Sequence, residues 1–253
     1  MADSVSRPAP PGHEDGPRPG AVRIEEGEAW TETAGSAVAG PLRDAVTSDG
    51  KASLALAGGS TPEPVYRWLA RSGPLPWERV DLFFGDERCV PPDDPASNYR
   101  MVRETLLEPL GADPQRVHRM QAERPDRDAA ADDYAAVLPP RLTVLLLGIG
   151  PEGHTASLFP GSPALDERRR RVVPVSTPAK PPERLTVTPP VLEAARHVVV
   201  LARGDRKADA VRRALEGSWS PTACPAQLAR RGTWILDPAA AALLTGRDGR
   251  PVS

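Results

Sequence analysis

Short apolar runs alternate with helix-like segments along most of this chain, and no other feature of the sequence constrains the fold as strongly. The runs that resemble strands are Ser53–Ala57, Val80–Phe84, Leu142–Leu147 and His197–Leu201. The third run is apolar apart from one threonine, which is typical of a strand covered on both faces. Strands that alternate with helices form a mainly parallel sheet with helices on both sides. The sequence therefore predicts an α/β fold whose ligand site lies beyond the carboxyl ends of the strands.

Helix-like segments follow three of these runs. They extend from Pro62 to about Arg71, onward from Ser97, and onward from about Asp205. In the third segment, apolar residues recur at the spacing that gathers them on one helix face. Prolines are frequent between residues 174 and 190, so we expect an irregular connection there rather than a helix.

The chain has 253 residues, enough for one large α/β domain or two small ones. Residues 1–20 are rich in proline, glycine and charge and cannot bury enough apolar surface to offset their ordering entropy. Residues 246–253 have a similar composition. We expect one domain over residues 21–245, with a disordered tail at the N-terminus and a flexible one at the C-terminus.

Charge and cysteine content exclude several classes of protein. The formal net charge is −2, which gives no basic field to hold nucleic acid, and the run Arg168–Arg171 is interpreted as a solvated loop. Two cysteines indicate a reducing compartment rather than a disulfide framework. The sequence has neither the ~20-residue apolar stretch of a membrane span nor the apolar core of a secretory signal. We therefore expect a cytoplasmic protein without a membrane partner.

A glycine-rich loop follows the first strand. Gly58 and Gly59 allow the backbone to approach a ligand closely, and Thr61 is the expected N-cap of a helix with Pro62 at its first position. The free N–H groups of residues 59–61 beside a positive helix end would bind an anion such as phosphate. The loop is neither a Walker A motif nor a serine-esterase elbow. A tight strand-to-helix turn without a ligand is the alternative.

Charged residues follow the second strand. Asp86 could handle a proton or a hydroxyl group, and Arg88 could bind a phosphate with two hydrogen bonds. Because they stand at a strand end, these side chains are placed where ligands bind in such sheets. A local salt-bridge cluster is the alternative interpretation.

A carboxylate and a histidine follow the third strand. Glu152 precedes His154 by two residues within Gly148–Gly161, a segment with an unusual density of glycine. A carboxylate at that distance can orient an imidazole and stabilise its charged form, as a general base requires. The alternative is a helix-capping loop with an incidental histidine.

The fourth strand is followed by Gly204, Asp205 and Lys207. Asp205 is the expected helix cap, and Lys207 then lies in the first helical turn, where a cation opposes the macrodipole. A bound anion beside Lys207 would relieve that conflict. A surface lysine is the simpler alternative.

These segments, in this order and spacing, resemble the 6-phosphogluconolactonase family within the glucosamine/galactosamine-6-phosphate isomerase superfamily. The resemblance extends from about Val22 to about Leu244. The motifs that carry it are Gly58–Pro62, Phe84–Pro91, Gly148–Gly161, Pro181–Thr186 and Gly204–Lys207. Glu152 departs from the family pattern, which has aspartate there, so the carboxylate of this chain is one methylene longer.

The resemblance implies a three-layer fold similar to glucosamine-6-phosphate deaminase and ribose-5-phosphate isomerase. It implies hydrolysis of 6-phospho-D-glucono-1,5-lactone in the oxidative pentose phosphate pathway, by a monomer or weak dimer without a metal or other cofactor. His154 would be the general base, Glu152 would hold it, and Asp86 would bind a sugar hydroxyl or orient water. Residues that would bind the phosphate or line the site are Gly58, Gly59, Ser60, Thr61, Arg88, Arg184 and Lys207. The sequence does not divide these cations between phosphate and oxyanion.

The sequence leaves two other functions possible. The glucosamine-6-phosphate deaminase family has a glutamate five residues after the histidine, whereas this chain has Phe159. A non-catalytic sugar-phosphate sensor would keep the cations and lose the base, whereas this chain keeps both Glu152 and His154.

Overall fold

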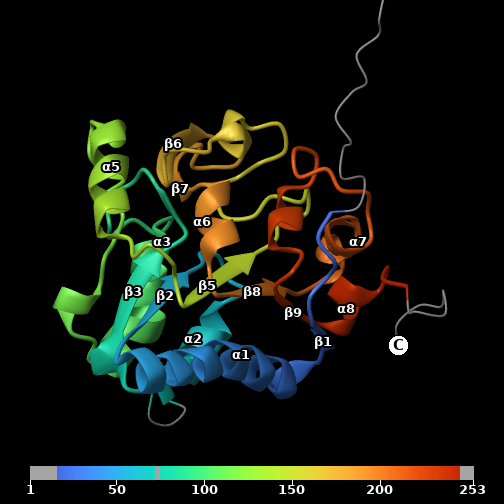
Figure 1. Cartoon of the computed structure of the whole chain (residues 1–253), viewed down its shortest axis with the longest axis horizontal. Coiled ribbons are helices and arrows are strands. Elements are labelled where there is room, and N and C mark those ends of the chain that lie inside the picture. Colours follow the sequence, from blue (N-terminus) through green and yellow to red (C-terminus); the bar gives the residue numbers. More distant parts are fainter. Residues whose placement is uncertain (1–15, 72–74, 246–253) are drawn as a thin grey trace, which may run out of the picture.

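The computed structural model describes residues 16–71 and 75–245, and its centre is a six-stranded, entirely parallel sheet (Figure 1). The strands lie in the order β1-β9-β8-β5-β2-β3. Their bounds are β1 Val22–Ile24, β2 Ala52–Leu56, β3 Val80–Phe84, β5 Val144–Gly148, β8 His197–Ala202 and β9 Thr233–Leu236. All residues of β2 are buried, as expected for an apolar strand covered on both faces.

Helices cover both faces of this sheet. Figure 1 shows α1 and α2 on one face and α5, α6 and α7 on the other, as right-handed crossovers require. The helices are α1 Gly27–Asp49, α2 Glu63–Arg71, α3 Asn98–Val102, α4 Glu108–Leu110, α5 Arg127–Val137, α6 Pro189–Ala194, α7 Ala208–Leu215 and α8 Pro238–Ala241. The three layers confirm the fold class expected from the alternating pattern.

A second, antiparallel sheet adjoins the carboxyl edge of the first. Its strands are β4 (Asp86–Arg88), β7 (Glu183–Val187) and β6 (Val172–Ser176), paired in that order. Gly85 links the two sheets, because its N–H donates to the Leu56 carbonyl at 2.9 Å and its carbonyl accepts from Val187 N–H at 2.9 Å. Residues of this small sheet therefore face the ends of the parallel strands.

The strand predictions match the structure closely. β3 has the expected bounds, and β8 extends one residue beyond them. β2 begins and ends one residue earlier than expected, and β5 begins at Val144 rather than Leu142. Differences of this size are ordinary at element ends, where the hydrogen-bond ladder begins or stops.

Two expected helix caps are wrong. The Pro62 carbonyl accepts the first helical bond, from Tyr66 N–H at 3.0 Å, so Pro62 rather than Thr61 is the N-cap of α2. Asp205 lies inside the 3₁₀ turn η5 (Asp205–Lys207), and Gly204 is its N-cap. Gly204 has a φ of 91°, which favours glycine over a capping side chain.

The proline-rich segment is more regular than its composition indicates. Pro174 lies within β6, and Pro189 and Pro190 open helix α6. The expected absence of a helix is wrong here because proline, with its fixed φ, suits the first helical turn, where an N–H has no partner.

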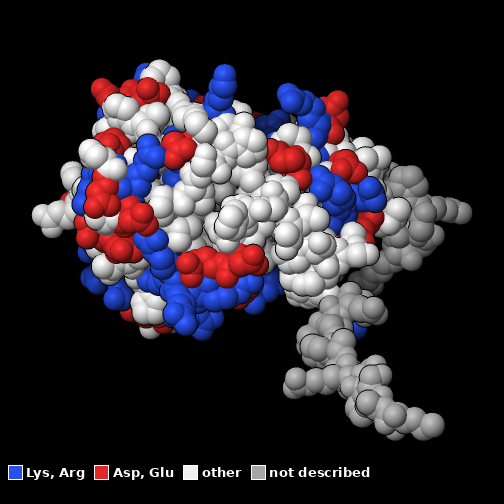
Figure 2. All heavy atoms as spheres, turned by 90° about the horizontal axis from the view of Figure 1, so that it is seen from above, with Lys and Arg blue, Asp and Glu red and all other residues white. Residues whose placement is uncertain are grey.

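The arginine run is partly fixed rather than solvated. Arg170 pairs with Asp128 at 2.7 Å and Asp132 at 2.9 Å on α5. Arg171 donates to the carbonyls of Ala135, Leu138 and Pro139 at the end of the same helix. A cation at a helix C-terminus satisfies carbonyls that have no helical partner. On the face in Figure 2, acidic and basic side chains lie interspersed.

The expected tails lie largely outside the described residues, since residues 1–15 and 246–253 are not described. Residues 16–20 have no regular secondary structure, and Gly20 N–H donates to the Arg230 carbonyl at 2.9 Å. Within residues 16–71 and 75–245, no helix combines the length and apolar character that crossing a bilayer requires.

Candidate active site

A cavity of about 340 Å³ lies beyond the carboxyl ends of β2, β3, β5 and β8. Its wall brings together nine of the ten residues predicted for the site: Gly58, Gly59, Ser60, Thr61, Asp86, Arg88, His154, Arg184 and Lys207. The tenth, Glu152, contacts His154 from outside this wall. Asn98 and Arg203 also line the cavity, although neither was predicted as a site residue.

The glycine-rich loop after β2 forms one side of the cavity. A Cβ atom at Gly58 would overlap the amide group of Asn98, so only glycine lets these two segments pack together. Gly59 has a φ of 88°, in the left-handed region that glycine adopts without strain. Both features bring the backbone of residues 58–61 to the surface of the cavity.

His154 and Glu152 lie in the loop after β5. His154 Nδ1 lies 3.1 Å from Glu152 Oε1. The angle is not that of a hydrogen bond, and Nδ1 has no hydrogen-bond partner among the described residues. The imidazole stacks on Phe159 with ring centroids 4.1 Å apart and an angle of 18°. A Cβ atom at Gly150 would overlap the His154 ring and come within 2.6 Å of Glu152 Oε2. The pair therefore occupies space that Gly150 leaves empty.

Burial lowers the pKa of His154 below its usual value, because a desolvated ring disfavours the charged form. Glu152 acts in the opposite direction, through its charge and its proximity to the ring. Burial has the larger effect, so the imidazole is neutral near pH 7 and available to accept a proton.

Asp86 is buried and already hydrogen-bonded. Its Oδ2 accepts from Ser157 Oγ at 2.6 Å, and its Oδ1 accepts from Asn98 Nδ2 at 3.2 Å. Arg184 Nη1 lies 3.9 Å from Oδ2 and donates to Ser157 Oγ at 3.3 Å. Ser157 is fully buried and was missed as a separate site residue, because its role depends on segments distant in sequence.

The basic side chains that line the cavity differ in their hydrogen-bond partners. Arg88 Nη1 donates to the Ala96 carbonyl at 2.6 Å, and Arg184 Nε donates to the Pro181 carbonyl at 3.1 Å. Burial lowers the pKa of Lys207, while the charge of Glu152 raises it. Among the described residues, neither Lys207 nor Arg203 has a side-chain hydrogen bond or ion pair.

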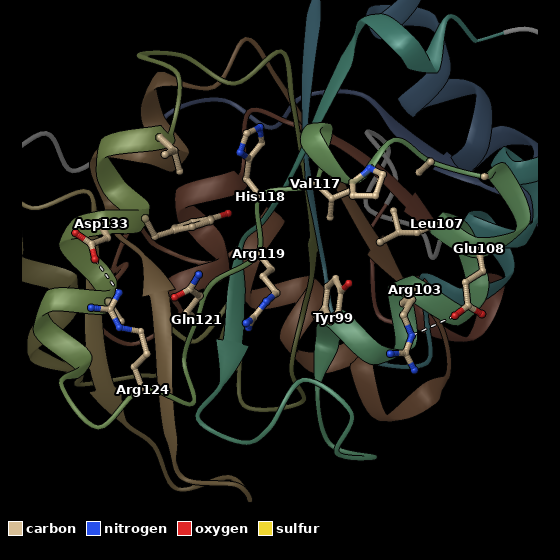
Figure 3. A pocket seen from close by; sticks show the side chains of 16 residues that line it. Tyr99, Arg103, Leu107, Glu108, Val117, His118, Arg119, Gln121, Arg124 and Asp133 are labelled. Atoms are coloured by element: carbon tan, nitrogen blue, oxygen red, sulfur yellow. Dashed lines mark hydrogen bonds and ion pairs between the residues drawn. The ribbon is translucent and has the colours of Figure 1, made fainter.

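A larger cavity, of about 690 Å³, lies on the other side of α3, and Tyr99 contributes to its wall (Figure 3). Its charged side chains are already paired. Arg103 lies 3.3 Å from Glu108, and Arg124 lies 2.7 Å from Asp133. None of the predicted site residues lines it, so the smaller cavity is the candidate active site.

Within the described part of the chain, no three His, Cys, Asp or Glu side chains are grouped closely enough to hold a metal ion.

Glycine-rich strand ends and a cation-lined cavity at the carboxyl edge of a parallel sheet define an α/β protein of the class that binds small anionic ligands. The family model for glucosamine-6-phosphate isomerases and 6-phosphogluconolactonases matches residues 25–236. The chain belongs to that family.

Two similar proteins carry the name 6-phosphogluconolactonase. The chain is 40% identical over 239 residues to 6-phosphogluconolactonase of Streptomyces coelicolor. The matched region covers 86% of this chain and 91% of the relative. It is 41% identical over 210 residues to human 6-phosphogluconolactonase, covering 76% and 81%.

Solved structures share the fold. The crystal structure of 6-phosphogluconolactonase from Thermotoga maritima has a TM-score of 0.76 at 26% identity, covering 86% of this chain and 99% of that one. A monomeric glucosamine-6-phosphate deaminase has a TM-score of 0.76 at 25% identity, covering 88% and 100%.

Proposed function

We propose that this chain is a 6-phosphogluconolactonase, which hydrolyses 6-phospho-D-glucono-1,5-lactone to 6-phospho-D-gluconate in the oxidative pentose phosphate pathway. One observation carries the proposal: His154, with the Glu152 carboxylate 3.1 Å from its Nδ1, lines a cavity whose wall also includes several basic side chains. Relatives about 40% identical over most of the chain bear the same name and support the reaction.

His154 accepts a proton from water in the first step. Glu152 lies against Nδ1, which leaves Nε2 as the nitrogen that takes the proton. The water oxygen forms a bond to the lactone carbonyl carbon, and negative charge develops on the carbonyl oxygen. Glu152 stabilises the imidazolium that results, as a nearby anion does.

The ring ester opens in the second step. The bond between the carbonyl carbon and the ring oxygen breaks as the tetrahedral intermediate collapses. The imidazolium returns its proton to the departing ring oxygen, so the product is an open-chain acid and His154 is neutral again. No covalent intermediate is needed, because a δ-lactone is an activated ester.

The phosphate binds at the backbone N–H groups of residues 59–61 and at Lys207. The exposed loop and the half-buried ammonium group face the same cavity. Arg88 and Arg184 lie on the wall formed by the small sheet, near Asp86. Cations there are placed to stabilise charge that develops on the carbonyl oxygen.

Deamination of glucosamine 6-phosphate is the second candidate, because a deaminase shares the fold. The aromatic ring of Phe159 stacks on His154, where the deaminase pattern has a glutamate. A phenyl ring cannot exchange a proton, so the site favours lactone hydrolysis. A non-catalytic sensor is less favoured, because a sensor does not need a neutral base in the cavity.

The deciding experiment compares lactone hydrolysis with its spontaneous rate. Titrating the released acid at constant pH should reveal turnover far above the spontaneous reaction, and glucosamine 6-phosphate should release no ammonia. Ammonia release without lactone turnover would assign the chain to the other branch of the family. Binding of gluconate 6-phosphate without either reaction would identify a sensor.

A cytoplasmic location and the absence of a nucleic-acid partner stay predictions from composition, supported by the two cysteines and the net charge of −2 respectively. A monomeric or weakly dimeric state stays a prediction from the family resemblance. Size-exclusion chromatography with light scattering would measure the oligomeric state.

A further inference from the structure

We propose that Arg203 is an additional phosphate-binding residue of this cavity and that Trp30 holds its guanidinium group in place. The inference rests on the proposed function for its substrate, and it assigns a role that no motif of the sequence indicated. Arg203 directly follows β8, at the edge of the sheet where the other cavity residues gather.

Arg203 is held in position by Trp30, which packs against the flat face of its guanidinium group. The guanidinium carbon lies 4.8 Å from the centroid of the Trp30 ring, within the range of a cation–π contact. Such a contact occupies the flat face and leaves the N–H groups at the edge directed outward. Those N–H donors are geometrically suited to two phosphate oxygens at once.

Trp30 is an unusual residue for its place. It is fully buried in the first turns of α1, and its indole Nε1 has no hydrogen-bond partner among the described residues. An aliphatic side chain in that place would avoid the cost of an unpaired N–H group. A flat aromatic surface beneath Arg203 is what the tryptophan supplies instead.

Arg203 lies on the same face of the sheet as the glycine-rich loop. Trp30 belongs to α1, and residues 58–61 lead into α2. The two helices pack against each other on one face (Figure 1). A phosphate held by the backbone of residues 59–61 is therefore on the side of the cavity that Arg203 lines.

The basic side chains that line the cavity differ in whether they already form hydrogen bonds. Arg88 and Arg184 donate to backbone carbonyls, whereas the side chains of Arg203 and Lys207 form no hydrogen bond or ion pair with any described residue. Arg203 is also exposed, so ordering it on a ring lowers the entropy lost when a ligand binds. Arg203 and Lys207 therefore bind the phosphate from the β8 side of the cavity.

The test compares Arg203→Gln with Arg206→Gln. Both variants remove one positive charge from the same loop, but Arg206 does not line the cavity. Arg203→Gln should raise KM for the phosphorylated lactone about tenfold with little change in kcat, which is the loss expected for a charge-assisted hydrogen bond. Arg206→Gln should change KM less than about twofold, as usual for an exposed charge. Gluconolactone without phosphate should be hydrolysed equally by both variants.

Arg203→Lys tests the geometry of the contact. Lysine keeps the charge but cannot donate in a planar fork or stack as guanidinium does. Its KM should lie between those of the parent and Arg203→Gln. A KM for Arg203→Gln equal to that of Arg206→Gln, or equal losses with and without the substrate phosphate, would overturn the inference.

A binding measurement separates this inference from the proposed function. Calorimetry with gluconate 6-phosphate should give a Kd about tenfold weaker for Arg203→Gln than for Arg206→Gln, whatever reaction the chain performs. Gluconate should show no such difference. If the parent fails to hydrolyse the lactone but the Kd difference holds, the phosphate role of Arg203 stands and the hydrolase function falls. If turnover is normal and the Kd values agree, the function stands and this inference falls.

Discussion

Ser157 Oγ donates a hydrogen bond of 2.6 Å to Oδ2 of Asp86, which ties the loop after β5 to the first residue of β4. The other carboxylate oxygen accepts from Asn98, and both groups are buried. Each oxygen of this carboxylate therefore accepts a hydrogen bond from a different segment of the chain. We infer that Asp86 acts by holding Ser157, Asn98 and Arg184 in position.

Replacing Ser157 with alanine should lower the free energy of unfolding by about 1–3 kcal/mol, because it removes a buried donor to a carboxylate. Chemical denaturation measures this change. Ser48→Ala, at an exposed position in α1, should change stability by less than about 0.5 kcal/mol. Equal effects of the two substitutions would contradict an organising role for the Ser157–Asp86 bond.

Replacing His154 with alanine should slow kcat by about 10²–10⁴ while the fold stays intact, since a general base contributes that much. Stopped assays with the phosphorylated lactone measure kcat, and circular dichroism checks the fold. His197→Ala is a suitable control, because His197 is exposed at the amino end of β8. Near-normal kcat in folded His154→Ala would remove the proposed base.

Glu152→Gln should shift the acidic limb of the pH–rate profile to lower pH. The carboxylate raises the pKa of His154 against the larger lowering by burial, so its loss lowers that pKa further. Because the reaction needs the neutral ring, activity then persists to lower pH even as maximal kcat falls.

Glu152→Asp is the second variant whose pH–rate profile should be compared with that of the parent. It keeps the charge and shortens the reach by one methylene, so it should lower activity modestly and leave the acidic limb nearly unchanged. An acidic limb that does not move in the glutamine variant would mean that Glu152 stabilises the loop without acting on the base.

Lys207→Ala should raise KM strongly for the phosphorylated lactone, by about tenfold or more, and hardly affect gluconolactone. The ammonium group lines the cavity with no partner among the described residues, so a substrate anion is its available counter-charge. Steady-state kinetics on both substrates provide the comparison. Equal losses on the two substrates would argue against phosphate recognition by this residue.

Gly150→Ala and Gly148→Ala form a matched pair two residues apart, because Gly148 ends β5 and Gly150 lies in the loop that follows. A methyl group at Gly150 would overlap the His154 ring and press on Glu152, whereas a methyl group at Gly148 meets nothing within 4 Å. Neither glycine has a positive φ, so backbone strain does not distinguish them. Gly150→Ala should lower kcat by at least about tenfold, as expected when a base is displaced. Similar kcat values for the two variants would show that the His154–Glu152 arrangement is not needed.

The sequence predicted those parts of the fold that local pattern determines. β3 is a mostly apolar run that ends before Gly85, and its bounds agree with the structure. β4 consists of Asp86, Glu87 and Arg88, and no pattern of charged residues predicts a strand. Its strand character comes from pairing with β7, nearly 100 residues later in the chain, as the register Asp86↔Thr186 shows. Long-range pairing of this kind has no local signal.

The same distinction applies to the site. His154, Lys207 and residues 58–61 follow strands of the parallel sheet, so position alone indicated them. Arg203 follows a strand as well, and that rule could have found it. Ser157 and Asn98 could not be found in this way, because their partner Asp86 lies on a different element.

The cavity lies on a seam between two sheets that meet at Gly85. The segments that follow strands of the parallel sheet supply His154 and Lys207, whereas the small antiparallel sheet supplies Asp86, Arg88 and Arg184. The proposed base and the proposed oxyanion cations therefore stand on different layers, and the Ser157–Asp86 hydrogen bond crosses between them. The spacing across the cavity is therefore set by how the two sheets dock, so a substitution far from the substrate that shifts one sheet against the other would separate the base from the charge it works with.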